Sequence, residues 1–139
     1  MLFLEFDGKK EAIGQLEGTA KFVKEPPKAF WTAVGQTVRQ GVIDNFRYGG
    51  DLATRQKWKP LKSGKPSKLT KTGRLREVVF QSDEGGAEVG TNMIYGRIHH
   101  FGGRAGRNLR AQIPARPWLT LSEETKLKIA SLIRNNLMK

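Results

Sequence analysis

The stretch PPKAFWTAVGQTVRQGVIDNFRYGG (residues 26–50) carries the strongest structural pattern in the chain. Its large apolar residues recur every three or four positions, which is the spacing of one face of an α-helix. A proline pair opens the stretch, where a missing backbone N–H is tolerated, and a glycine pair closes it, since glycine adopts a left-handed helix cap at little cost. The pattern predicts an amphipathic helix over about residues 27–48, with Asn45 mostly on its polar side. The apolar positions are Phe30, Trp31, Val34, Val38, Val42 and Phe46.

Two weaker elements precede this helix. Residues 2–7 (LFLEFD) place Leu2, Leu4 and Phe6 on one face of an extended chain, which predicts a short strand. Residues 9–22 space their apolar side chains as a helix does, which predicts a short helix.

The C-terminal side predicts a hairpin and two further helices. Residues 76–82 and 87–91 are typical of strands, and the turn residues DEGG lie between them. Residues 93–101 predict a short helix, and the last helix begins near Thr120 or Ser122, either of which can cap it. These elements predict an α+β fold, in which a small, mostly antiparallel sheet from residues 76–92 and the N-terminal strand is packed by the long helix and the C-terminal helix. A chain of 139 residues fits one domain, residues 1–139.

The positive charge is concentrated in two segments. The net charge is +12, and residues 55–76 carry nine basic side chains and no acidic one. Residues 89–122 carry five arginines and no acid, whereas residues 77–88 carry four acids and no base. Residues 55–74 also lack any regular apolar spacing and are rich in Lys, Pro, Gly and Ser, so we expect a long, flexible basic loop there.

The residues that could carry chemistry do not form a recognisable site. The chain has no cysteine, and its two histidines, His99 and His100, are adjacent. Neighbouring residues on a helix point ~100° apart, which suits one metal ion poorly, so we expect one histidine to pack or hydrogen-bond and the other to face solvent. The acids are explained by a turn and a helix start, and GGRAGR lacks the strand and lysine of a phosphate-binding loop. We expect no enzyme, metal or other cofactor, and no secretion signal or membrane span.

The segment IPARPWL (residues 113–119) is the most specific short motif. Its prolines forbid helix and stiffen the chain, and stiffness lowers the entropy cost of docking. We expect Trp118 and Leu119 to point inward and Arg116 to lock either the neighbouring loop or an adjacent subunit. Basic residues of both charged segments are candidates for contact with an acidic protein surface or with nucleic acid. The hypothesised interface set is Lys57, Lys59, Lys62, Lys65, Lys68, Arg104, Arg107, Arg110 and Arg116.

The order of short motifs along the chain resembles a known family. The motifs are W-x-P-L from Trp58, T-x-x-G-R-L, V-G-T-N, Y-x-x-I-H-x-F-G-G from Tyr95, and I-P-A-R-P-W-L, followed by a capped helix. This order is similar to that of the virion morphogenesis, or tail completion, proteins of tailed bacteriophages, including Mu-like ones, and the likeness covers about residues 27–137. The motif residues expected to matter structurally are Trp58, Tyr95, His99, Phe101, Gly102, Pro114, Pro117 and Trp118.

The resemblance implies a structural assembly protein rather than an enzyme. Such a protein is made in the host bacterial cytoplasm and becomes part of the virion, where it completes the tail or joins it to the head. The implied partners are tail tube and neck or head-completion proteins, and related proteins commonly act as rings on a small α+β fold. A basic DNA-binding protein is the alternative that the charge leaves open. Non-specific DNA contact is compatible with an assembly protein as well.

Overall fold

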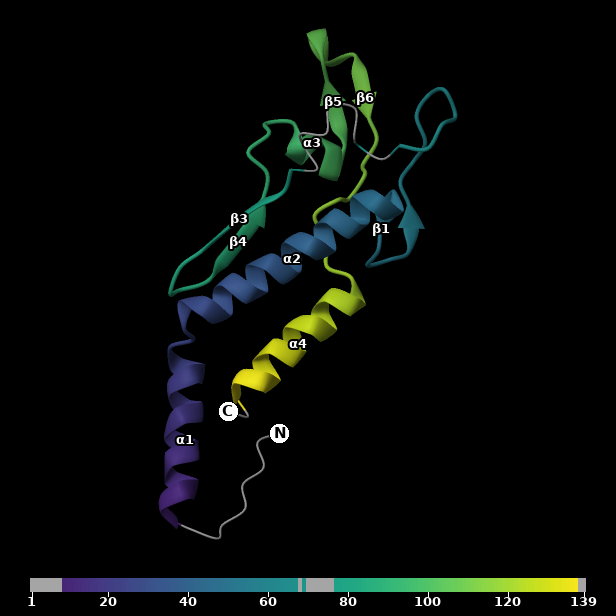
Figure 1. The fold of residues 1–139 in the computed structure, drawn as a ribbon. Coiled ribbons are helices and arrows are strands. Elements are labelled where there is room, and N and C mark those ends of the chain that lie inside the picture. The colour runs from purple at the N-terminus through teal and green to yellow at the C-terminus, as the bar shows by residue number, and fades with distance from the viewer. Residues whose placement is uncertain (1–8, 68, 70–76, 138–139) are drawn as a thin grey trace.

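The computed structural model describes residues 9–67, 69 and 77–137, with side chains from residue 17 onward. Four helices and a short 3-10 helix alternate with short strands (Figure 1). The elements are α1 Lys9–Lys24, α2 Lys28–Tyr48, β1 Gly50–Asp51, β2 Gln56–Lys57, β3 Val79–Ser82, β4 Ala87–Gly90, α3 Gly96–Phe101, β5 Gly103–Ala105, η1 Arg107–Leu109, β6 Ala111–Ile113 and α4 Glu123–Leu137.

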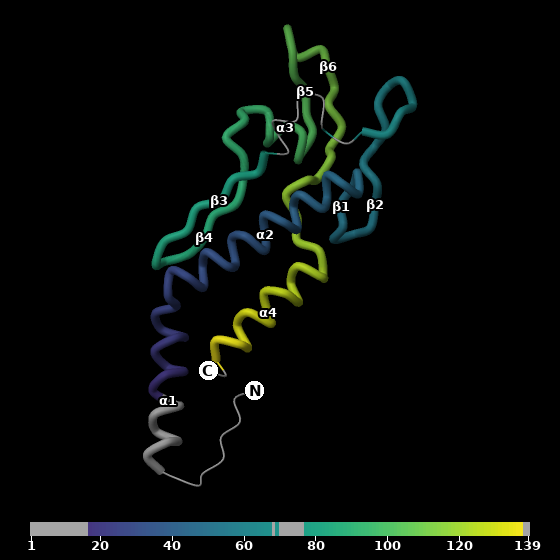
Figure 2. The backbone as a smooth tube through the Cα atoms, viewed as in Figure 1, coloured from purple at the N-terminus to yellow at the C-terminus, as the bar shows by residue number. Residues whose placement is uncertain are grey.

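Helix α2 is the axis of the fold. The β3–β4 hairpin packs along one side of α2 and α4 packs along another, while α1 continues the chain beyond the N-terminal end of α2 (Figures 1 and 2). Glycines in α2 make these approaches possible. A Cβ added at Gly35 would lie 2.6 Å from Cδ2 of Phe80 on β3, and one added at Gly41 would lie 2.3 Å from Oγ1 of Thr125 on α4.

The core lies toward the C-terminal half of α2. Val42 and Phe46 project from the helix into a buried cluster with Trp58, Val78 and Trp118. The ring of Phe46 meets that of Trp58 edge-on at 5.6 Å between centroids and lies 5.9 Å from that of Trp118. Such aromatic contacts add to the free energy gained by burying the rings. The segments around Trp58 and Trp118, which are far apart in the sequence, thus pack against the same helix, α2.

The predicted α+β fold is confirmed. The long helix, the residue 9–22 helix, the short helix before Gly102 and the C-terminal helix all form, as does the 79–90 hairpin. Strand β3 pairs antiparallel with β4, with Phe80 opposite Val89. The predicted strand at residues 2–7 lies outside the described residues.

Two further hairpins were not predicted. In the described part of the chain the strands form three separate two-stranded sheets, because β1 pairs with β2 and β5 pairs with β6. The arginine-rich residues 104–112 lie within the second of these hairpins. The β5–β6 register pairs Arg104 with Gln112, and backbone hydrogen bonding creates a hairpin there without an alternating apolar pattern.

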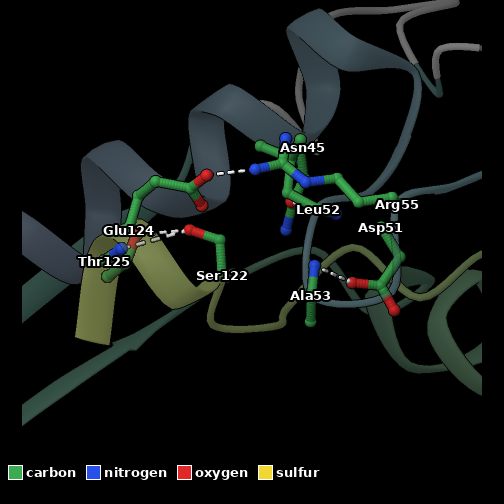
Figure 3. Close-up of polar contacts among 8 residues, drawn as sticks. All are labelled: Asn45, Asp51, Leu52, Ala53, Arg55, Ser122, Glu124 and Thr125. Carbon is green, nitrogen blue, oxygen red and sulfur yellow. Dashed lines mark hydrogen bonds and ion pairs between the residues drawn. The ribbon is translucent and has the colours of Figure 1, made fainter. Parts of the chain in front are cut away.

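Ser122, rather than Thr120, caps α4. The Thr125 backbone N–H donates to Oγ of Ser122 at 3.2 Å (Figure 3). Thr120 instead donates its hydroxyl proton to Oδ1 of Asp51 at 2.8 Å. Of the two caps that the sequence allowed, the structure thus uses the one nearer to the helix, and Thr120 takes a tertiary contact.

Candidate functional site

The motif residues converge on a clamp that joins residues 58–60 to residues 113–118. Trp58 donates its indole N–H to the Pro117 carbonyl at 2.8 Å, and Trp118 donates its own to the Gly96 carbonyl at 2.9 Å. Both indoles are buried against Phe46. Because each indole has a polar partner, the two tryptophans bury their rings without leaving an unpaired donor. The clamp therefore fixes the loop after β2, the α3 region and the IPARPWL segment relative to α2.

Arg116 locks the clamp from inside the chain. Only 7% of its surface is exposed. Its Nε donates to the Lys59 carbonyl at 2.9 Å and its guanidinium Nη2 donates to the Pro60 carbonyl at 3.2 Å. Of the two roles expected for Arg116, the intrachain lock is thus seen, and contact with a neighbouring subunit stays a prediction. Burial lowers the pKa of Arg116, but a guanidinium keeps its charge throughout the biological pH range.

Asn45 is the central polar residue that the sequence did not single out. It was expected on the polar side of the long helix, but the structure buries it completely. Its Nδ2 donates to the Trp118 carbonyl at 2.9 Å and to the Thr120 hydroxyl at 3.0 Å, while its Oδ1 accepts the Leu52 N–H at 3.1 Å. Figure 3 shows this region, where Asp51 also accepts the Ala53 N–H at 2.9 Å. A helical asparagine immediately before a core phenylalanine was the available clue.

The remaining motif residues support the chain path around the clamp. Gly102 has a φ of 75° and a Cβ there would lie 2.7 Å from the Ala115 nitrogen, so only glycine fits without strain. Tyr95 packs against the core, and its ring lies 5.7 Å from that of His99. Phe101, by contrast, is exposed. The two prolines, Pro114 and Pro117, are partly buried.

Both histidines lie against the clamp, which corrects the expectation that one would face solvent. Each is partly buried, and Nδ1 of His100 accepts the Leu119 N–H at 3.3 Å. Burial, aided by the positive charge of Arg116, lowers the pKa of His99 below its ordinary 6.5. Burial also lowers the pKa of His100, against an opposing effect of Asp51. Both shifts favour the neutral imidazole.

The segments that carry most of the described basic interface residues, the loop after β2 and the β5–β6 hairpin, lie at the end of the molecule where α2 terminates (Figure 1). Lys59, Lys62 and Lys65 are exposed on the loop after β2. Lys57 is exposed too, but its ammonium hydrogen-bonds to the Tyr48 carbonyl and lies 3.8 Å from the centre of the Tyr48 ring. Lys68 lies outside the described residues.

The second group of basic residues lies on a projecting hairpin, residues 103–113, which we call the arm. Arg104, Arg107 and Arg110 of the arm are all exposed. The loop and the arm are brought to one end of the fold by the Arg116 bonds to Lys59 and Pro60. The clamp thus joins the bases of two basic segments that are remote in sequence.

The described residues do not build a metal site. Nowhere in them do three His, Cys, Asp or Glu side chains come close enough together to bind a metal ion. Among the described helices, none combines the length and apolar character that crossing a membrane requires.

Comparison with known proteins identifies the family. The phage virion morphogenesis family matches residues 10–138. The Mu-like prophage FluMu G protein 2 of Haemophilus influenzae is 32% identical over 136 residues, which cover 97% of this chain and 95% of that protein. No solved structure matches the chain. The clamp residues Trp58, Arg116 and Trp118 all lie within the matched region, and the chain belongs to the phage virion morphogenesis family.

Proposed function

We propose that this phage morphogenesis protein completes the tail, either by terminating it or by joining it to the head, as a homo-oligomeric ring. The observation that carries the proposal is the family match over residues 10–138. The Mu-like prophage relative, aligned over nearly its whole length, supports the same role. The protein acts structurally in this account, with no catalytic step, in the host cytoplasm during assembly and then in the virion.

The layout of charge supports a docking role. The clamp is rigid, because its indoles, its buried guanidinium and Asn45 are all hydrogen-bonded. The lysines of the loop and the arginines of the arm lie on the segments that the clamp joins, and they are exposed. Positive surfaces of this kind accelerate association with negative partners and orient them on arrival. Acidic faces of tail tube and neck or head-completion proteins are the partners that fit.

A null mutant tests the proposed role. Induction of a prophage that lacks this gene should yield no infectious particles, and electron microscopy should show heads and tails accumulating separately, or tails of irregular length. A plasmid copy of the wild-type gene should restore joined particles. Particles of normal number and shape in the null lysate would overturn the proposal.

DNA binding is the second candidate, and the same exposed cations favour it. A protein that neutralises several phosphates binds duplex DNA with an affinity that falls steeply as salt rises. A mobility-shift assay with the isolated protein decides between the two: tight binding that survives physiological salt, and is lost when Lys59, Lys62 and Lys65 become glutamine, would favour this candidate. Binding that disappears at physiological salt would favour a protein partner.

A further inference from the structure

The arm presents an apolar residue among arginines at its tip. Leu109 is 60% exposed, and Asn108 and Leu109 hold φ values of 57° and 53°, a left-handed backbone that leucine rarely adopts. Arg107 and Arg110 flank this leucine and are exposed. Among the described residues the ion pairs join Arg47 to Asp44 and Arg55 to Glu124, so neither arm arginine meets a described carboxylate. The tip has the composition of a protein–protein contact surface, with an apolar residue at its centre and charged residues around it.

A groove of complementary character lies elsewhere on the same chain. It has a volume of about 240 Å³ and is lined mainly by apolar side chains of α2, β4 and the segment before α4. That volume is small for a drug-sized ligand, whose pockets measure ~300–1,000 Å³, but it can admit an aliphatic side chain. The apolar lining residues are Val34, Val38, Val42, Ala87, Val89, Leu119 and Leu121.

Acidic residues lie on the β3–β4 hairpin, whose strand β4 supplies Ala87 and Val89 to the groove. Ala87 also lines a second hollow at the turn, together with Asp83 and Glu88. Glu84 is exposed on the same turn. Residues 77–88 contain no basic side chain. An apolar groove beside an acidic hairpin is the complement of a leucine flanked by arginines.

The arm and the β3–β4 turn of one chain lie toward opposite ends of α2 (Figure 1). The arm projects beyond the C-terminal end of this helix, whereas the β3–β4 turn lies beside its N-terminal end (Figure 1). We propose that the arm of one copy docks on the β3–β4 surface of the next copy, with Leu109 in the groove and Arg107 and Arg110 against Glu84 and Glu88. The occupant is a second copy because this chain carries both complementary surfaces.

Such a contact is head-to-tail, because each copy uses two different surfaces. Repeated contacts of this kind close into a ring when the rotation between copies permits, and otherwise they extend into a filament. The inference rests on the proposed function only in assuming that copies assemble, and it adds which surfaces meet. Charge complementarity would set the register between copies, while burial of Leu109 would supply apolar contact.

Exchange of charge between the two surfaces tests the proposal. One variant, E84K/E88K, makes the turn basic, and the other, R107E/R110E, makes the arm acidic. Neither variant alters a residue of the clamp, and circular dichroism and melting temperature check that each folds.

Wild-type protein in low-salt buffer should form an oligomer, as measured by light scattering after size-exclusion chromatography, and each variant alone should elute as a monomer. An equimolar mixture should regain the oligomer, because every arm then meets a face of opposite charge. The matched control K126E/K128E, on exposed residues of α4, should assemble like the wild type.

Several results would overturn the proposed contact. They are a wild-type protein that stays monomeric up to its solubility limit, a folded variant that assembles alone, and a mixture that does not regain the oligomer. A variant R107E/R110E that loses only duplex DNA binding and keeps the oligomer would assign the arm to nucleic acid instead. This test is separate from the null mutant: co-assembly in the mixture, together with normal particles in the null lysate, would support the contact and refute the role in the tail.

Discussion

The buried guanidinium of Arg116 explains why an arginine lies between the two prolines of IPARPWL. It satisfies the carbonyls of Lys59 and Pro60, which are exposed residues of a basic loop. A lysine has one ammonium and no planar fork, so it cannot reproduce both bonds with the same geometry. The arginine of the motif is therefore explained by hydrogen bonds within the chain, whichever partner the surrounding surface binds.

Replacement of Arg116 by alanine should lower the free energy of unfolding by about 2–3 kcal/mol, because hydrogen bonds to a charged group are worth ~1.5–3 kcal/mol. Urea denaturation followed by tryptophan fluorescence measures the change. Arg110→Ala, on the exposed arm, is the matched control and should change stability by less than ~0.5 kcal/mol. Equal midpoints for the wild type and R116A would show that the lock contributes nothing.

The histidines predict a pH dependence of stability. The folded state lowers the pKa of His99 and His100 below 6.5 by burial, so the unfolded state binds more protons once the pH falls to that value. Their contribution to stability is complete above pH 6.5 and is lost progressively as the pH falls below it. Unfolding free energies at pH 7.5 and pH 5.5 should differ in that direction, and His99→Gln should reduce the difference. An identical pH dependence in H99Q would contradict this assignment for His99.

Among the elements, helix α2 contains glycines that lower its helix propensity but allow close packing against its neighbours. Glycine is ~1 kcal/mol less favourable than alanine inside a helix, yet Gly41 lies against Thr125 of α4, which is itself held by Ser122. Gly41→Ala should therefore destabilise the protein by about 1–2 kcal/mol despite its better propensity, since overpacking a core costs ~1–3 kcal/mol. Gly18→Ala in α1 meets nothing within 4 Å and should stabilise by up to ~1 kcal/mol. Thermal melts of both variants check the opposite signs, and a higher melting temperature for G41A would contradict the packing argument.

The elements with a strong local period were predictable, and those formed by distant contacts were not. Helix α2 shows its apolar spacing over several turns, and the β3–β4 hairpin shows its turn residues. The β5–β6 hairpin carries glycine and arginine without alternation, so nothing local distinguishes it from a loop. Strands β1 and β2 span two residues each, too few for a period to appear.

The sequence singles out the motif residues but not the contacts that they make. Trp58 and Trp118 lie in the clamp, and Gly102 lies close to Ala115 beside it. The partners of Arg116 are backbone carbonyls 57 and 56 residues away, and backbone groups leave no trace in side-chain patterns. Asn45 was assigned to the wrong side of its helix for a similar reason, because its partners in the 118–120 segment are tertiary.

In the whole molecule, the clamp and helix α2 carry two basic segments, the loop after β2 and the arm, and one acidic segment, the β3–β4 turn. Residues 55–74 remain the segment predicted to be flexible, although Trp58 is buried and the Leu61 N–H donates to the Lys65 carbonyl at 2.8 Å. Limited trypsin digestion of the folded protein should cut first within residues 55–74, where basic side chains are dense. Mass spectrometry of the earliest fragments locates the cut. First cleavage within the arm, at Arg104, Arg107 or Arg110, would contradict this expectation.

We propose that copies of this chain become a permanent part of one end of the phage tail. Immunogold labelling of purified particles that carry an epitope-tagged chain locates those copies. We expect gold at a single position, at the junction with the head or at the tail terminus, in particles that remain infectious. Infectious particles that lack the tagged chain, or that bind gold along the whole length of the tail, would contradict it.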